Sequence, residues 1–94
     1  MQFSKVSGQK NQHKVVLYAL STCAWCRMTK QFLKDHDIEY EYIDVDLCEE
    51  EEKQKIREHI QSKGGPLSYP TIIVDDNVLI TGFRTDKLRE ALQL

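Results

Sequence analysis

The sequence lacks a long hydrophobic run. Residues 1–13 are polar, without the apolar stretch of a signal peptide, and no later segment is long enough to span a bilayer. The sequence also lacks an excess of one charge, since 13 basic and 15 acidic residues give a formal net charge of -2, and no basic face is evident. We therefore expect a cytoplasmic protein whose partners include neither a membrane nor a nucleic acid.

Cysteine is scarce as well, with three residues, an odd number that does not suit a secreted disulfide framework. A single C-x-x-C in a reducing compartment suits redox or metal chemistry instead. Zinc needs about four ligands. Beyond the C-x-x-C pair, the remaining candidates are Cys48, His13, His36 and His59, which form neither a second C-x-x-C nor a spaced histidine pair. We therefore expect no metal site, and we interpret Cys48 as an inert, small apolar residue.

Hydrophobic spacing divides the chain into a polar N-terminal extension and one domain. Residues 1–13 show no periodicity, whereas residues 14–94 are long enough for one modest core. The spacing predicts strands at 15–20, 38–46, 71–74 and 78–80, helices at 24–37 and 49–63, and a final helix with Thr85 as its N-cap. The predicted order is β, α, β, α, β, β, α, which is an α/β domain.

Cys23 and Cys26 lie where the first predicted strand turns into the first predicted helix. The unpaired N–H groups and positive dipole of a helix N-terminus stabilise a thiolate relative to a thiol. Cys26 follows Cys23 by three residues, on nearly the same helix face and within disulfide reach. Arg27 and Lys30 add positive charge and are expected to stabilise the thiolate. We therefore predict that Cys23 is the nucleophile and Cys26 the resolving thiol.

Three features together resemble the glutaredoxin family of the thioredoxin fold. They are C-A-W-C at residues 23–26 after the first strand, Tyr69-Pro70 before the hairpin, and Gly82-Phe83-Arg84-Thr85-Asp86 after it. The resemblance covers residues 14–94, which we expect to form a glutaredoxin-like domain. It implies a βαβαββα thioredoxin-like fold, with a central four-stranded mixed sheet flanked by three helices.

The resemblance also implies a substrate groove. In the family, the proline that matches Pro70 is cis and lies against the cysteines, and the residue before it, here Tyr69, offers backbone groups to an extended substrate. An X–Pro bond is the place where a cis peptide is cheap, and exposed backbone groups there can pair with a substrate strand. The expected substrate-binding residues are Thr22, Trp25, Tyr69, Pro70, Gly82, Phe83 and Arg84.

Two positions bear on the electron donor. Glutathione-using members often carry a lysine where this chain has Leu20, and a Gly-Gly pair where it has Thr81-Gly82. Residues 81–86 look more like the Ser-Gly-Phe-Arg-Pro-Asp of the glutaredoxin-like redoxins that reduce ribonucleotide reductase. The resemblance implies a monomeric dithiol oxidoreductase, an electron carrier in cell redox homeostasis. Its expected substrates are protein or small-molecule disulfides, ribonucleotide reductase among them, and its donor is either glutathione or a thioredoxin-reductase-type protein.

The alternative is an iron–sulfur carrier or assembly module on the same scaffold. Some glutaredoxins with a residue other than proline after the first cysteine hold a [2Fe-2S] cluster between two subunits, together with glutathione. Ala24 fits that description, whereas the missing lysine at Leu20 counts against it. The sequence thus predicts thiol–disulfide exchange without a resident cofactor, with glutathione as a candidate reductant and the cluster as the competing hypothesis.

Overall fold

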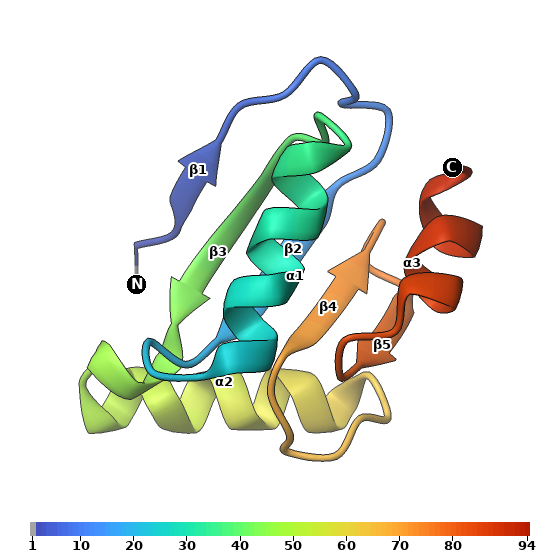
Figure 1. The fold of residues 1–94 in the computed structure, drawn as a ribbon. Coiled ribbons are helices and arrows are strands. Elements are labelled where there is room, and N and C mark those ends of the chain that lie inside the picture. Colours follow the sequence, from blue (N-terminus) through green and yellow to red (C-terminus); the bar gives the residue numbers. More distant parts are fainter. Residues whose placement is uncertain (1) are drawn as a thin grey trace.

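A mixed sheet of five strands runs through the centre of the protein (Figure 1). The computed structural model describes residues 2–94. The strands are β1 (Ser4–Val6), β2 (Val15–Ala19), β3 (Tyr40–Asp44), β4 (Thr71–Val74) and β5 (Val78–Thr81). They lie side by side in the order β1-β3-β2-β4-β5, so β1 and β5 form the two edges. β2 and β3 run parallel, and the other neighbouring pairs run antiparallel.

Two α-helices and one short 3-10 helix connect the strands, and a third α-helix follows the last strand. They are α1 (Ala24–Asp35), η1 (Val45–Leu47), α2 (Glu50–Ser62) and α3 (Thr85–Leu92). The prediction of Thr85 as the N-cap of the last helix is wrong, because Arg84 occupies the cap in an extended conformation and Thr85 is already helical. In the part of the chain that the structure describes, no helix combines the length and the apolar character needed to cross a membrane.

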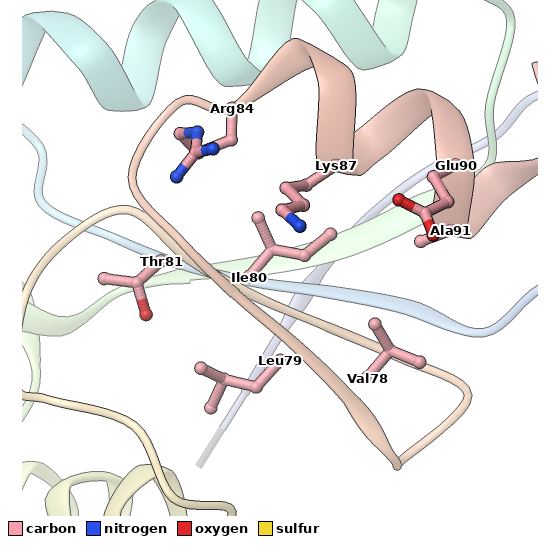
Figure 2. Close-up of a pocket in the computed structure, with 8 residues that line it drawn as sticks. All are labelled: Val78, Leu79, Ile80, Thr81, Arg84, Lys87, Glu90 and Ala91. Atoms are coloured by element: carbon pink, nitrogen blue, oxygen red, sulfur yellow. The ribbon is translucent and has the colours of Figure 1, made fainter.

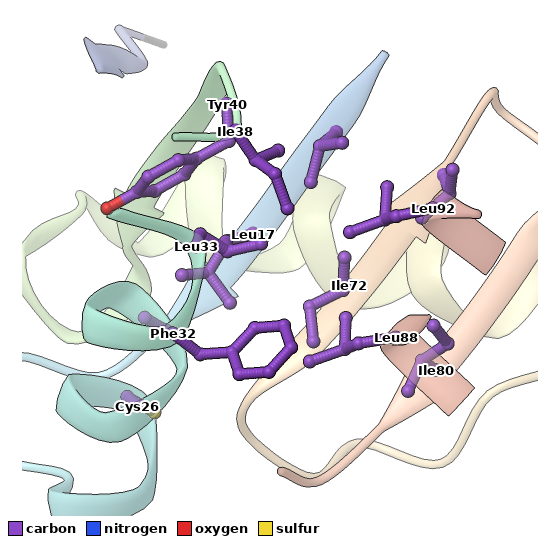
Figure 3. Packing of buried hydrophobic residues seen from close by; sticks show 13 residues of the cluster. Leu17, Cys26, Phe32, Leu33, Ile38, Tyr40, Ile72, Ile80, Leu88 and Leu92 are labelled. Carbon is purple, nitrogen blue, oxygen red and sulfur yellow. The ribbon is translucent and has the colours of Figure 1, made fainter. Parts of the chain in front are cut away.

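Strand β2 divides the core into two halves. All five of its residues are buried, as a continuous apolar run predicts for a central strand. Because side chains alternate along a strand, Leu17 packs with residues of α1 and α3 on one face, and Tyr18 packs with residues of α2 on the other. Figure 3 shows the first half, where Phe32 of α1 and Leu88 of α3 meet over Ile72 of β4. The carboxyl end of β2 therefore emerges between two covered faces.

The prediction of a four-stranded sheet was one strand short. The additional strand is β1, which lies within the extension at residues 1–13 and pairs antiparallel with β3. The three residues of this strand are exposed or half-buried, so they carry no hydrophobic signal that a sequence pattern could reveal. The element order from β2 onward agrees with the prediction.

Backbone contacts hold the extension against the connection between α1 and β3. The N–H of Lys10 donates to the carbonyl of Asp37 at 2.9 Å, and the N–H of Glu39 donates to the carbonyl of Lys10 at 2.9 Å. Gly8 passes so close to the same connection that a Cβ there would lie 2.6 Å from the Asp37 carbonyl oxygen. A side chain at position 8 would therefore push two backbone segments apart.

A Gly8→Ala substitution is expected to lower the free energy of unfolding by about 1–3 kcal/mol, because the methyl group overpacks against backbone that cannot rotate away. Urea unfolding followed by circular dichroism measures the change. Ser7→Ala, at the exposed neighbouring residue, is the matched control and should stay within about 0.5 kcal/mol of the wild type. Equal stability of the two variants would contradict the close approach at Gly8.

Candidate active site

Cys23 and Cys26 occupy the start of α1 in unequal environments. Cys23 is the N-cap of the helix, in an extended conformation, and is a partly exposed residue. Its Sγ accepts a hydrogen bond from the N–H of Cys26 at 3.2 Å. Cys26 is the third residue of the helix, within its first turn, and is fully buried. The pair thus consists of one sulfur that a reagent can reach and one that the core shelters.

Burial is the main reason that the pKa of Cys26 is raised, from an ordinary 9.0 to about 12. The hydrogen bond and charge of Cys23 act in the same direction, whereas the N–H of Leu20, 3.5 Å from the Cys26 Sγ, lowers the pKa. Lys30 lowers it as well, as the smallest of these influences. At neutral pH, Cys26 in the reduced protein is therefore a neutral thiol.

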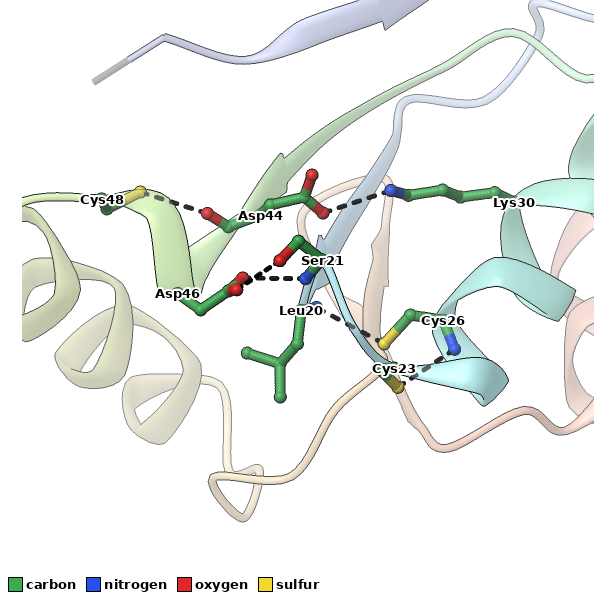
Figure 4. A network of polar contacts seen from close by, with 8 residues as sticks. All are labelled: Leu20, Ser21, Cys23, Cys26, Lys30, Asp44, Asp46 and Cys48. Atoms are coloured by element: carbon green, nitrogen blue, oxygen red, sulfur yellow. Dashed lines mark hydrogen bonds and ion pairs between the residues drawn. The ribbon is translucent and has the colours of Figure 1, made fainter.

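The turn between β2 and α1 contacts both cysteines through one residue (Figure 4). The N–H of Leu20 donates to the Cys26 Sγ at 3.5 Å, and the carbonyl of Leu20 accepts from the N–H of Cys23 at 3.3 Å. A small displacement of Leu20 would therefore change the surroundings of both cysteines at once.

A groove of about 210 Å³ lies beside the cysteine pair. Its lining consists of five predicted substrate-binding residues: Trp25, Tyr69, Pro70, Gly82 and Phe83. The Tyr69–Pro70 bond is cis, as the resemblance to glutaredoxins implies. The Trp25 side chain is 59% exposed, and its ring lies 6.2 Å from that of Phe83, centroid to centroid. The groove offers an apolar surface to a substrate.

Some backbone groups at the groove are already hydrogen-bonded within the protein, and others are free to bind a substrate. The N–H of Gly82 donates to the carbonyl of Pro70 at 2.7 Å, and Gly82 has a φ of 84°, a left-handed conformation that glycine adopts easily. Within residues 2–94, neither the N–H nor the C=O of Tyr69 has a backbone hydrogen-bond partner. Tyr69 can therefore offer both groups to an extended segment.

Arg84 and Thr22, also predicted to bind substrate, lie outside the groove lining. Arg84 borders a separate hollow of about 620 Å³ between β5 and α3, where Lys87 and Glu90 also lie (Figure 2). Its guanidinium contacts the Asp86 carboxylate at 3.3 Å. Thr22 is exposed in the turn before Cys23. Roles for Arg84 and Thr22 in substrate binding stay predictions.

The two cations predicted to stabilise the thiolate point in different directions. The Lys30 ammonium lies 3.1 Å from the Asp44 carboxylate and 4.1 Å from the centroid of the Tyr42 ring. Its charge is thus directed mainly toward β3, while Arg27 is exposed. The backbone N–H of Cys26 is the group in contact with the Cys23 sulfur, so we assign it the larger stabilising effect.

Sequence reasoning missed a contact between Asp46 and Ser21. The N–H of Ser21 donates to Oδ1 of Asp46 at 2.8 Å, and the Ser21 hydroxyl donates to Oδ2 (Figure 4). These hydrogen bonds hold the pKa of the Asp46 carboxyl below its usual range. A signal was available, because β2 and β3 are parallel and their carboxyl ends meet at one edge of the sheet.

The third cysteine, Cys48, follows η1 and contacts the last residue of β3. The Cys48 thiol lies 3.6 Å from the carbonyl of Asp44, and burial raises its pKa. Among the residues that the structure describes, no group of three or more His, Cys, Asp or Glu side chains could hold a metal ion. The two thiols at the start of α1, Cys23 and Cys26, support thiol chemistry at this site.

Comparisons with known proteins agree with this geometry. The glutaredoxin family model matches residues 15–79. The methanoredoxin of Methanosarcina acetivorans is 40% identical, with a TM-score of 0.88, covering 100% of this chain and 97% of that one. The glutaredoxin of Methanosarcina mazei Go1 is 35% identical, with a TM-score of 0.89, covering 100% and 90%. A glutaredoxin-like 8.6 kDa protein in the rubredoxin operon of Clostridium pasteurianum is 28% identical over 84% of this chain and 97% of that protein.

The family match spans more than half of the chain and includes Cys23, Cys26 and the Tyr69–Pro70 bond. The five-stranded sheet and three α-helices match the thioredoxin-like fold of the solved neighbours. Fold, sequence and the cysteine pair lead to one conclusion: the chain belongs to the glutaredoxin family of thiol–disulfide oxidoreductases.

Proposed function

We propose that this chain reduces protein disulfides by dithiol exchange, with Cys23 attacking and Cys26 resolving. The observation that carries the proposal is the unequal placement of the two sulfurs. Cys23 is a partly exposed residue whose Sγ accepts an N–H at the start of α1, whereas Cys26 is fully buried. An N–H donor at a helix N-terminus stabilises negative charge on sulfur, and an attacking thiolate must also be accessible.

The proposed reaction consists of two exchanges. The Cys23 thiolate attacks one sulfur of the substrate disulfide, forms a mixed disulfide and releases the other substrate sulfur as a thiolate. Cys26 then loses its proton and attacks the Cys23 sulfur, which releases the second substrate thiolate and leaves a Cys23–Cys26 disulfide. The substrate gains two electrons and the cysteine pair loses them.

The groove supports an extended protein segment as the substrate. Trp25 and Phe83 offer apolar surface, and the backbone N–H and C=O of Tyr69 can pair with a substrate strand. A segment that carries an apolar side chain next to its cysteine would cover the exposed Trp25 ring. Ribonucleotide reductase, which regenerates through disulfide exchange, is the first protein substrate that we propose to try.

Two classes of donor can return the pair to the dithiol state. Two molecules of glutathione would do so through a mixed disulfide with Cys23 and leave as glutathione disulfide, and a thioredoxin-reductase-type protein would do so by exchange with its own dithiol, which becomes a disulfide. Leu20, in place of the lysine common in glutathione-using members, favours the second class. We propose that the reaction takes place in the cytoplasm, because a reducing compartment keeps such a pair in the dithiol state. We also propose that the protein acts as a monomer.

The competing hypothesis, transfer of a [2Fe-2S] cluster, differs in its observables. A cluster bridging two copies would use Cys23 as a ligand in each copy, since Cys26 is sheltered in the core. It would give the anaerobically purified protein visible absorbance and a dimeric state. Dithiol exchange requires neither, and it gives Cys26 a role that the cluster does not.

A Cys26→Ser substitution is expected to trap the mixed disulfide at Cys23, because a serine hydroxyl cannot displace the substrate thiolate. The reduced variant is mixed with a disulfide-linked peptide without added reductant, and intact mass followed by peptide mapping locates the adduct. Cys48→Ser is the matched control and should release the peptide as the wild type does. No adduct on Cys26→Ser, or an adduct on Cys48, would contradict the assignment.

The stability of the reduced protein is expected to fall between pH 9.0 and about 12. In this window the unfolded chain has lost the Cys26 proton while the folded chain retains it, so the unfolded state binds fewer protons and gains relative stability as the pH rises. Urea unfolding at pH about 8 and about 10.5 measures the decline. Cys26→Ser lacks the titrating group and should decline less, and identical declines would contradict the raised pKa.

A further inference from the structure

We propose that Asp46 is a positioning residue for dithiol exchange: its carboxylate holds the turn between β2 and α1 and thereby keeps the Leu20 N–H against the Cys26 sulfur. The inference rests on the proposed roles of Cys23 and Cys26 and adds a residue outside the C-x-x-C motif and the groove. The chemical step that depends on Asp46 is the attack of Cys26 on the Cys23 sulfur.

Two hydrogen bonds join Asp46 to a single residue of the turn. The Ser21 N–H donates to Oδ1 at 2.8 Å, and the Ser21 hydroxyl donates to Oδ2 (Figure 4). Two bonds from the two oxygens of one carboxylate fix the orientation of Ser21 as well as its position. Asp46 itself follows Val45, which is buried in the core on the α2 side of the sheet. The carboxylate is therefore anchored although its own side chain is exposed.

The peptide bond between Leu20 and Ser21 transmits this orientation. It is a trans peptide, so its N–H and C=O are coplanar and point in opposite directions. The N–H, from Ser21, donates to Asp46, and the C=O, from Leu20, accepts from the N–H of Cys23 at 3.3 Å. Asp46 and the Cys23 N–H thus bind opposite sides of the rigid peptide group between Leu20 and Ser21.

The next group along the chain reaches the resolving sulfur. The N–H of Leu20 lies 3.5 Å from the Cys26 Sγ. If Ser21 moves, Leu20 moves with it, and the Leu20 N–H turns away from the Cys26 sulfur, which weakens this hydrogen bond because its strength depends on the N–H···S angle. The link from Asp46 to Cys26 therefore runs through two adjacent residues rather than through a chain of side-chain contacts.

A second carboxylate from the same part of the chain holds the helix itself. Asp44, the last residue of β3, lies 3.1 Å from the ammonium of Lys30 in α1. The carboxyl end of β3 thus contacts both the helix that carries the cysteines and the turn that precedes it. Asp44 contacts the helix, whereas Asp46 contacts the turn. Of these two carboxylates, Asp46 is therefore the one connected to the Leu20 N–H, through Ser21.

The chemical consequence concerns the second exchange. When Cys26 loses its proton and attacks the Cys23 sulfur, negative charge passes through the Cys26 sulfur, and the Leu20 N–H is placed to stabilise it. The first exchange, the attack by Cys23, develops no charge on Cys26. Loss of the Asp46 contact should therefore slow resolution and leave the initial attack unchanged.

The reaction with an aromatic disulfide, 5,5′-dithiobis(2-nitrobenzoate), separates the two exchanges. The attack by Cys23 releases one coloured thiolate at a rate proportional to reagent concentration, and resolution by Cys26 releases the second at a rate independent of it. All variants carry Cys48→Ser, so that the third thiol contributes no signal. Stopped-flow absorbance measures both phases in the reduced, full-length chain.

Asp46→Ala is expected to slow the second phase by roughly three- to tenfold, the effect of losing one or two modest hydrogen bonds, with the first phase unchanged. Asp46→Asn retains an oxygen that accepts from the Ser21 N–H and should stay within about twofold of the reference. Ser21→Ala keeps the backbone bond and should fall between these. Asp35→Ala, at an exposed aspartate that bonds only Gln31 in its own helix, is the matched control and should change neither phase.

An unchanged second phase in Asp46→Ala would overturn the inference, and so would an equal slowing of both phases, which indicates a loosened helix start rather than a lost contact to Cys26. Failure of Asp46→Asn to restore the second phase would also overturn it. Failure of the proposed function has a different signature, because the reference chain itself would then release no second thiolate.

Discussion

The hydrogen bond from the Cys26 N–H to the Cys23 Sγ is the contact on which the site depends. It requires Cys23 to stand outside the helix as its N-cap while Cys26 stands inside it, and this difference makes one sulfur accessible and the other buried. A helix beginning one residue earlier would place both thiols in the helix, and a helix beginning three residues later would place both in the turn. The unequal burial of the two cysteines, on which their proposed roles depend, thus follows from where α1 begins.

The sheet determines where α1 can begin. β2 is buried on both faces, so its carboxyl end emerges at an edge where the parallel strand β3 also ends. Backbone groups of Leu20 there meet both cysteines, and carboxylates from the end of β3 meet Ser21 and Lys30. The active site therefore combines a helix N-terminus with the ends of two parallel strands, which explains why residues far apart in sequence cooperate in it.

The sequence was sufficient for those parts of the structure that have a local signal. The change from a continuous apolar run at residues 15–20 to helical spacing after Ala24 located the cysteine pair at a strand-to-helix turn, and the structure confirms that location. The cis bond at Tyr69–Pro70, which the structure also contains, was implied by the resemblance to glutaredoxins and not by the local sequence, since most X–Pro bonds are trans. The physics that located the cysteine pair, in contrast, lies within a few neighbouring residues.

Features that depend on distant backbone contacts could not be predicted. β1 is polar and three residues long, and its pairing with β3 together with the close approach of Gly8 leaves no periodic pattern. Arg84, and not Thr85, is the N-cap of α3. The path of the chain after Gly82 sets the start of this helix, and it overrides the capping propensity of threonine.

The contact between Asp46 and Ser21 could be predicted from the sequence only in part. Parallel strand order brings the two residues to the same edge of the sheet, which is predictable. Which carboxylate reaches the Ser21 N–H depends on the path of the chain through the single turn of η1. A sequence pattern does not specify that turn.

An equilibrium redox titration of the wild-type chain tests the central claim most directly. The protein is equilibrated in graded ratios of reduced and oxidised dithiothreitol, quenched with acid, alkylated and mapped by mass spectrometry. Dithiol exchange between Cys23 and Cys26 predicts a single transition between about -200 and -270 mV, in which these two residues become linked and Cys48 stays alkylated throughout. A disulfide that includes Cys48, or no Cys23–Cys26 linkage at any ratio, would contradict it.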